Sequence, residues 1–570
     1  MKRLSCLLAV LLSVFLLSAY YPGNGSGFHY DGMVIPIGNE IYDLMDSLFI
    51  LEGKGLPSTS RPWTVSEAKN ELGKLDKDSL SSESFELYKE IDGMLAYEKE
   101  NDISLTVSFS PEMYAHTNDT YNREELWNYG YEDRNHMFRV SLDNSTGGFY
   151  GHLELSGGIG VVSGEDAASR ITLKSYVENN LGKDWNGVGS EYPVGDEELS
   201  SIYVITNETN YSKNFVINAP SGSNTDMNMP RRAYLDYAGS NFSVGFYKAQ
   251  KEWGNNSIGN FIFDRHHDYY DTLTLKTFSP DFSFEYTWMF PETYPGGKNG
   301  YSDSNPNSRR IFLAHRLEFR AFDRLSVALS ENVMYRFSSL PDIPLMNPAF
   351  FYHNNVNNGQ FNALAHVEVA YSILSGLLVY GQFSLDQGSF PGFEDPTTED
   401  QAVGMSLGLE WNGYFKKGII SAVFEALYTT PALYRPSGSS DFIIHYNHLD
   451  VNDYYRYPFF TYIGYEEGGD TIELLGSVSY RKNSLYLYSK ADLRIKGEYG
   501  MYDEYHIPIA LSTPSGKPVS TLTLNTGVEK EFNVFGVPLV SFLDIAAVID
   551  SSRGFDMQFS LGASVSYSLI

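Results

Sequence analysis

From residue 103 to the end of the chain, hydrophobic and polar residues alternate in short runs. The clearest runs are residues 403–411, 485–496 and 559–569, in which nearly every second side chain is apolar. A period of two places successive side chains on opposite faces of a β-strand. The pattern therefore predicts an all-β body, and residues 369–385 read as two strands joined by a Ser-Gly turn.

The apolar strand faces need either a protein core or a lipid environment. Runs of about 9–11 residues are long enough to cross a membrane as tilted strands. Short connections at 375–376 and 416–418 alternate with long ones at 184–210, 291–309, 386–402 and 435–470, and an aromatic residue lies near the chain end. This layout is typical of outer-membrane barrels. At roughly 22–28 residues per strand and connection, residues 103–570 predict a transmembrane antiparallel β-barrel of about 16–20 strands.

Residues 22–100 follow a helical pattern instead. Ile41, Leu44 and Leu48 recur at helical spacing, and the sequence from Thr64 to Glu67 is a capping box. We expect a small N-terminal domain of two or three helices that covers or plugs the barrel and carries no chemistry of its own.

The first residues have the layout of a secretory signal peptide. A cationic start at residues 1–3 precedes an apolar run at 7–17 and a small-residue site, which predicts cleavage near Ala19. The single cysteine, Cys6, lies in this segment, so the mature chain has no thiol and suits an oxidising compartment. No later stretch predicts a transmembrane helix.

The charge balance narrows the function classes. With 41 Lys+Arg against 71 Asp+Glu, the net charge is −30, which excludes an ordinary nucleic-acid binder. Aromatic residues make up 15% of the chain, so a disordered protein is excluded as well.

Some charged residues lie in the predicted strands. Arg316, Glu318 and Arg320 share the face predicted to line the lumen. Glu331 and Glu425 fall in phase with apolar residues, where a carboxylate facing lipid would be costly. A β-bulge that reverses the register is therefore predicted at each of these two positions.

Catalytic and metal-binding motifs are not apparent in the sequence. It contains no His-Glu-x-x-His, Gly-x-Ser-x-Gly or phosphate-binding Gly-Lys motif. Residues 264–268, Asp-Arg-His-His-Asp, hold adjacent histidines that would point to opposite faces of a strand. We expect no metal, no cofactor and no enzymatic activity, although an acidic chain could still pair carboxylates for glycoside hydrolysis.

Three segments in order resemble the Wzi-type capsule assembly family. They are His-Arg-Leu-Glu-Phe at 315–319, the stretch 344–353 that contains Asn-Pro and Phe-Tyr-His, and residues 378–383. Pro-Trp-Thr at 62–64 resembles the family's N-terminal helical part. The resemblance implies an 18-stranded outer-membrane barrel with a periplasmic helical bundle, which attaches capsular polysaccharide to the cell surface as a lectin.

Three functions stay open at this point. The first is an outer-membrane barrel that binds surface or capsular polysaccharide and helps to attach or assemble it. The second is a porin or uptake channel, although the bulky polar face of residues 486–496 favours a closed lumen. The third is a secreted, β-rich, glycan-active enzyme.

The first function implies a location and a set of partners. We expect the outer membrane of a Gram-negative-type envelope, contact with its lipid and with polysaccharide, no nucleic acid and a monomeric state, with the capsule export machinery as a further candidate partner. The candidate glycan-binding residues are Arg316, Glu318, Asn347, Tyr352 and His353.

Overall fold

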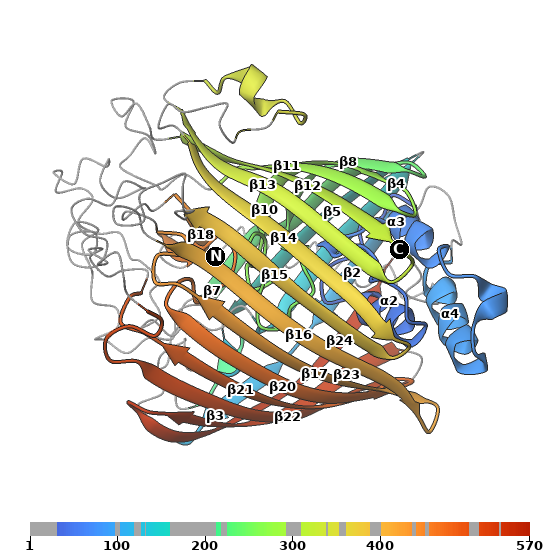
Figure 1. The fold of residues 1–570 in the computed structure, drawn as a ribbon. Helices are drawn as coiled ribbons and strands as arrows, with labels where there is room; N and C mark the ends of the chain where they lie inside the picture. The colour runs from blue at the N-terminus through green and yellow to red at the C-terminus, as the bar shows by residue number, and fades with distance from the viewer. Residues whose placement is uncertain are drawn as a thin grey trace, which may run out of the picture.

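The protein is a closed antiparallel β-barrel with helices at one end (Figure 1). The computed structural model describes residues 31–96, 103–118, 127–130, 133–146, 148–159, 213–217, 225–291, 309–337, 340–350, 352, 361–387, 401–435, 441–450, 455–500, 512–534 and 537–569. The predicted signal peptide and the candidate residue His353 lie outside these ranges.

The barrel wall contains 18 strands, which confirms the predicted fold class. β2 (Ile103–Phe109) and β3 (Glu112–His116) lie end to end along β24 (Gly554–Ser568), and this pairing closes the barrel. The other wall strands are β4 (Phe138–Thr146), β5 (Phe149–Ile159), β7 (Thr225–Ala238), β8 (Phe242–Ala249), β10 (Tyr270–Phe278), β11 (Phe282–Met289), β12 (Arg309–Ala321), β13 (Leu325–Phe337), β14 (Phe361–Leu374), β15 (Leu377–Gln387), β16 (Ala402–Phe415), β17 (Gly418–Thr429), β20 (Thr471–Lys482), β21 (Leu485–Lys496), β22 (Val519–Val534) and β23 (Val537–Asp550).

Five further strands of the described chain are not included in this count. They are β1 (Ser60–Arg61), β6 (Phe215–Val216), β9 (Glu252–Trp253) and the hairpin partners β18 (Ile443–Asp450) and β19 (Tyr455–Tyr462). β6 runs parallel to β3, whereas the wall strands pair antiparallel. The predicted Ser-Gly turn at 375–376 joins β14 to β15, as the alternation indicates.

The alternation along each strand sorts side chains between the two faces of the wall. On β16, Leu407 and Leu409 are exposed on the outside, while the intervening Gly408 is buried. On β21, Tyr488 points into the lumen, where its hydroxyl donates to Asp544 Oδ2 at 2.7 Å. An apolar outer surface and a polar interior are the reverse of a soluble protein and the norm for a membrane barrel.

Both predicted bulges are wrong. Glu331 on β13 pairs in regular register with β12 and β14, and Glu425 on β17 does so with β16 and β20. Glu425 and Ile419 lie on the same face of β17, which is the inner one. Ile419 packs there against the helices, so an apolar residue on this face does not indicate contact with lipid. Glu331 does face outward, and His315 Nε2 lies 3.3 Å from its carboxylate.

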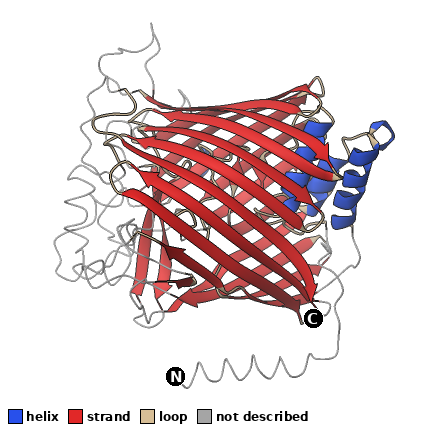
Figure 2. Cartoon of the chain, turned by 90° about the horizontal axis from the view of Figure 1, so that it is seen from below, coloured by secondary structure: helices blue, strands red, loops and turns tan. Residues whose placement is uncertain are grey.

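Three helices form a compact unit at the end of the barrel that has the short turns (Figures 1 and 2). They are α2 (Glu40–Leu51), α3 (Val65–Leu72) and α4 (Ser82–Met94), with a 3-10 turn η1 (Lys77–Ser79) between the last two. The Thr64 side chain accepts a hydrogen bond from the Glu67 N–H at 3.2 Å, which caps α3. Within the described ranges, no helix combines the length and apolar character needed to cross a membrane.

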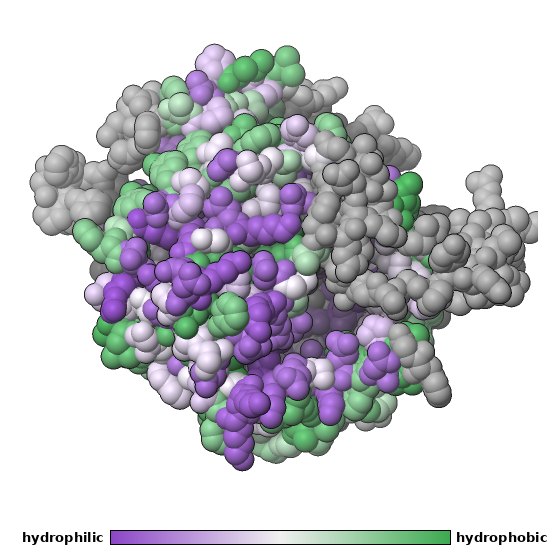
Figure 3. Space-filling view, turned by 90° about the vertical axis from the view of Figure 1, so that its right-hand side faces the viewer, coloured by the Kyte–Doolittle hydropathy of each residue, from purple (hydrophilic) through white to green (hydrophobic). Residues whose placement is uncertain are grey.

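The helix end of the molecule has a hydrophilic centre. Figure 3 shows polar side chains gathered over the middle of this face and hydrophobic ones around its edge. The strand ends that the long connections join, such as the end of β11 and the start of β12, lie at the opposite end of the barrel (Figure 1).

Candidate functional site

The lumen contains a segment of the N-terminal unit, residues 53–64, which we call the plug segment. It leaves α2 at the helix end, and its residues Ser58, Thr59 and Ser60 are buried inside the barrel. A second segment, residues 250–269 between β8 and β10, enters from the long-loop end and is called the inserted loop. The two meet where β1 pairs with β9, with Ser60 opposite Trp253.

The inserted loop is fixed to lumen-facing side chains of the wall. Asn256 Nδ2 donates to Ser406 Oγ at 2.6 Å, and the Ser257 and Ile258 N–H groups donate to Glu425 at 2.8 Å. Gly254 has a φ of +118°, and a Cβ at this position would lie 2.1 Å from Asn260 Oδ1. Only glycine fits this turn without displacing its neighbours.

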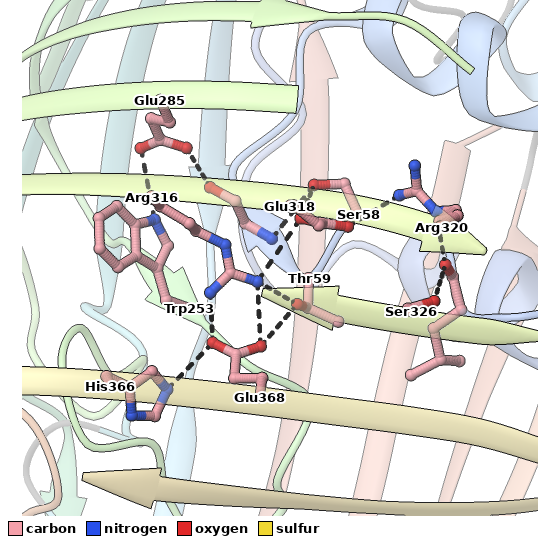
Figure 4. A network of polar contacts seen from close by, with 12 residues as sticks. Ser58, Thr59, Trp253, Glu285, Arg316, Glu318, Arg320, Ser326, His366 and Glu368 are labelled. Carbon is pink, nitrogen blue, oxygen red and sulfur yellow. Dashed lines mark hydrogen bonds and ion pairs between the residues drawn. The ribbon is translucent and has the colours of Figure 1, made fainter. Parts of the chain in front are cut away.

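Arg316 lies at the centre of the contact between the plug segment and the wall (Figure 4). Its side chain is 1% exposed and forms an ion pair with Glu368 on β14. Its Nη2 also donates to Thr59 Oγ1 at 2.6 Å, and Thr59 Oγ1 donates in turn to Glu368 at 2.9 Å. The guanidinium lies 5.5 Å from the ring of Trp253, so it contacts both segments that fill the lumen.

Glu318 contacts the plug segment nearer to the helices than Arg316 does. Its carboxylate accepts from Ser58 Oγ at 3.0 Å and from Arg320 Nη2 at 2.8 Å (Figure 4). Arg320 in turn lies 3.2 Å from Glu71 of α3. This chain of contacts joins the wall, the plug segment and the helical unit.

Glu285 on β11 completes the group of buried charges. It lies 2.5 Å from Lys251 of the inserted loop and 3.7 Å from Lys276 of β10, and it also accepts a hydrogen bond from Ser60. The four cations and five carboxylates of this group are called the lumen ion network: Lys251, Lys276, Arg316, Arg320, Glu67, Glu71, Glu285, Glu318 and Glu368. Buried charges of this kind are tolerated only when they are paired and hydrogen-bonded.

Asn347 and Tyr352 lie on the outer side of the wall. A strap formed by residues 340–350 and 352, which includes the 3-10 helix η6 (Ile343–Met346), folds back over β11 to β14. Tyr352 is 3% exposed, and its hydroxyl donates to Leu345 O at 2.6 Å. Its N–H donates to Glu331 at 3.1 Å, so the strap covers the outward carboxylate.

The five sequence candidates therefore do not form one cluster. Arg316 and Glu318 lie together in the lumen, with 3.5 Å between their side chains. Asn347 is an exposed residue of the strap, where its Oδ1 accepts a hydrogen bond from the Ala349 N–H at 3.0 Å. Because strand residues alternate, His315 and the strap lie on one face of β12 and Arg316 on the other.

Several residues that matter in the lumen were missed from the sequence. Glu285 and Glu368 lie on the lumen face, and their neighbours along the strand, on the other face, are apolar. The same alternation identified Arg316 and Glu318. The Ser58–Ser60 run gave no such signal, because a polar run between two helices ordinarily indicates an exposed loop.

The histidine segment 264–268 is occupied by internal contacts. His266 Nδ1 lies 2.9 Å from Asp264, and His267 Nε2 lies 2.7 Å from the carbonyl oxygen of Tyr462. Within the part of the chain that the structure describes, no group of His, Cys, Asp and Glu is arranged to hold a metal ion. The geometry supports a structural role for this segment in the inserted loop.

Comparisons with known proteins show which solved structures have a similar fold. No family model and no curated protein matches the sequence. Among solved structures, the chain is similar to Wzi of Escherichia coli, described as an outer-membrane protein involved in group 1 capsule assembly and a carbohydrate-binding β-barrel. The identity is 13%, the match covers 93% of this chain and 98% of Wzi, and the TM-score is 0.52.

Other similar structures come from Pseudomonas aeruginosa. OccK3 is 8% identical over 82% of this chain and 96% of its own, with a TM-score of 0.38. OprD is 8% identical over 83% of this chain and 97% of its own, with a TM-score of 0.37. The resemblance to Wzi that the sequence predicts thus extends to the architecture, and the chain has the fold of an outer-membrane β-barrel of the Wzi kind.

Proposed function

We propose that this protein is an outer-membrane barrel that binds a surface or capsular polysaccharide and helps to attach or assemble it at the cell surface, without enzymatic activity. The observation that carries this proposal is the filled lumen, in which the plug segment and the inserted loop meet at the β1–β9 pair. A barrel filled from both ends suits a binding scaffold better than a passage for solutes. The carbohydrate binding described for Wzi supports the same role.

The proposal implies an orientation in the membrane. Outer-membrane barrels have short turns on the periplasmic side and long connections outside. The helices then lie in the periplasm, after removal of the signal peptide near Ala19, and are the surface available to the capsule export machinery. The polysaccharide is bound at the opposite end, by a protein that acts as a monomer.

The sequence candidates take separate roles in this proposal. Arg316 and Glu318 hold the lumen closed, since their polar atoms contact the plug segment and the wall. Asn347 and His353 remain the candidates for direct hydrogen bonds to sugar, and Tyr352 positions the strap that carries Asn347.

The test compares how much surface polysaccharide is retained by cells that lack the gene and by the same cells complemented with it. Cells complemented with the native protein should retain the polymer, whereas cells with the double variant Asn347→Ala, His353→Ala should release more of it at an equal amount of membrane protein. Equal retention with and without the gene would contradict the function, and an inert double variant would contradict the assignment of these two residues.

A planar-bilayer recording separates this function from that of a channel. We expect the purified native protein to show little or no steady conductance, because the lumen ion network closes the barrel. A stable open-channel conductance in the native protein would favour the porin alternative instead.

A further inference from the structure

The strap formed by residues 340–350 and 352 lies beside the outer surface of the wall, near the end opposite the helices, where η6 is drawn in yellow (Figure 1). The Tyr352 N–H donates to Glu331, which is the middle residue of the 13-residue strand β13. Glu331 pairs with His315, the middle residue of β12. Because tilted strands of about 9–11 residues cross the hydrocarbon core of a membrane, the middle of these strands lies within it. The strap therefore extends to membrane depth.

The backbone of the strap suits an environment without water. Lipid tails form no hydrogen bonds with peptide groups, so irregular backbone at this depth needs partners within the protein. The prolines at 341, 344 and 348 have no N–H group that requires a partner. Acceptors in the strap or the wall bind the N–H groups of six further strap residues: Asp342, Leu345, Asn347, Ala349, Phe350 and Tyr352.

The side chains of the strap are arranged in the same sense as those of the wall. The Tyr352 hydroxyl donates to Leu345 O at 2.6 Å and lies 2.9 Å from the Tyr286 hydroxyl of β11, so these polar atoms are enclosed between strap and wall. Leu340 and Ile343, in contrast, are 81% and 77% exposed. Apolar side chains outside and polar atoms beneath them are the arrangement expected of a surface in contact with lipid.

An open groove of about 610 Å³ runs between the strap and the outer faces of β10 and β11. Its size falls within the range of about 300–1,000 Å³ that is usual for small-ligand sites. On β11, Trp288 pairs with Leu313 of β12, which is two residues from His315, so the groove lies at membrane depth as well. Its apolar lining consists of Leu273, Trp288 and Phe290 on the wall and Ile343, Pro344 and Met346 on the strap.

The floor of the groove continues into the lipid-facing wall. Leu273 pairs with Phe246 of β8, which is 53% exposed on the outer surface. The ring of Phe246 lies 6.1 Å from the ring of Phe290. Asn347 is the polar lining residue, and its Oδ1 accepts a hydrogen bond from the Ala349 N–H at 3.0 Å. The groove therefore opens onto the surface that contacts membrane lipid.

We propose that this groove binds an acyl chain of a membrane lipid, in the leaflet at the end of the barrel opposite the helices. Lipid tails are the apolar groups that meet this part of the wall. A chain in the groove contacts the strap and the wall together, whereas a chain on the open wall contacts protein on one side only, so dispersion favours the groove. The inference goes beyond the proposed function and does not depend on polysaccharide binding.

The experiment uses the whole purified protein in vesicles of phosphatidylethanolamine, part of which carries a photoactivatable diazirine in its acyl chain. One portion is irradiated in the vesicles, and another after extraction into detergent and washing. Mass spectrometry then locates the attached lipid along the chain. In the vesicles, the whole outer wall should be labelled. After washing, the label should remain on the strap and on β10 and β11 and disappear from the other strands.

Two pairs of variants test the assignment to the groove. Met346→Glu places a charge in the groove, and its matched control is Ala349→Glu, at an exposed strap residue outside the lining. Leu273→Trp fills the groove from the wall, and its control is Leu407→Trp, at an outward leucine of β16 that is 62% exposed. Met346→Glu and Leu273→Trp should lose most of the label retained after washing, whereas both controls should keep it. A heat-dependent shift in gel migration checks that each variant is folded.

Three results would overturn this inference. Retained label that is absent, or spread evenly over the wall, would show that the groove holds no lipid of its own. A dimeric mass in the same detergent, with no lipid on the strap, would assign the groove to a second copy of the chain. Unchanged label in folded Met346→Glu and Leu273→Trp would refute these lining residues. Retention of surface polysaccharide is measured separately, so the proposed function can stand or fail independently of this result.

Discussion

At the scale of single residues, the largest energetic demands come from charges buried in the lumen. Arg316 compensates Glu368 and donates to Thr59, and its side chain is 1% exposed. Its loss would leave buried carboxylates without a partner. Removing one member of a buried pair typically costs about 3–5 kcal/mol, much more than an exposed pair contributes.

We therefore expect Arg316→Ala to loosen the plug segment. The variant should admit protease to residues 53–64 and show bursts of conductance in planar bilayers, because the bonds that close the lumen are weakened. Arg324→Ala is the matched control, since Arg324 lies exposed in the turn after the same strand and donates to the carbonyl oxygen of Ile373. Equal behaviour of the two variants would contradict a closing role for Arg316.

A second prediction concerns Glu67 of α3, which contacts Lys276 at 2.5 Å. Burial raises the pKa of its carboxyl from 4.5 to about 7, although Lys276 lowers it. A raised pKa means that the folded state holds this proton more tightly than the unfolded state. The contribution to stability is present below about pH 4.5 and is lost as the pH rises through 7, with a magnitude on the order of 3 kcal/mol.

Glu67→Gln should therefore gain stability relative to the native protein between pH 5 and pH 8, as measured by hydrogen exchange of the α3 amides. Glu71, in the same helix, is the matched control. Burial alone would raise the pKa of the Glu71 carboxyl, but Arg320 and Lys74 hold this pKa below its ordinary value. Glu71→Gln should lose stability over this range, and a parallel response of the two variants would refute the assignment.

At the scale of elements, the sequence predicts the strands far better than what fills them. Strand residues alternate under a local rule, so the turn at 375–376 and the run at 403–411 could be identified directly. The plug segment obeys no periodicity, and its partners lie far away along the chain, as in the contact of Ser58 with Glu318, which are 260 residues apart. Glu425 was misread for the same reason, because apolar lumen residues beside it pack against helices that alternation alone does not locate.

The plug segment supplies the third prediction. Replacing Ser58, Thr59 and Ser60 with alanine removes the side-chain hydrogen bonds to Glu318, Glu368 and Glu285. Since each hydrogen bond to a charged group contributes about 1.5–3 kcal/mol, the triple variant should detach the plug segment from the wall. The expected result is a rise in conductance with an unchanged amount of barrel in the membrane.

Ser79→Ala, Ser82→Ala provides the control for that experiment. Both serines are exposed residues of the helical unit that lie outside the lumen, so the double variant should conduct no more than the native protein. Conductance that is low in all three proteins would mean that the inserted loop alone closes the barrel.

At the scale of the whole molecule, the sequence could predict the closure of the sheet but not which candidate residues lie together in space. The number of strands follows from chain length and strand spacing, and the resemblance to Wzi narrows it to the value observed. The candidate residues were chosen from adjacency along the chain. The wall separates Arg316 from Tyr352, because neighbouring segments of a barrel can lie on opposite faces of one sheet.

The last prediction tests the barrel itself by its resistance to SDS. The wall closes through β24, which pairs with β2 and β3, so no strand edge is free to start unzipping in the described wall. The native protein should migrate differently in an SDS gel with and without boiling, because the unboiled barrel keeps its compact form. The truncation that removes residues 554–570 deletes β24 and should abolish the difference, whereas Arg324→Ala should preserve it. A native protein that runs identically in both samples and leaves the membrane in high salt would refute the membrane barrel and would favour a soluble glycan-active enzyme with paired carboxylates.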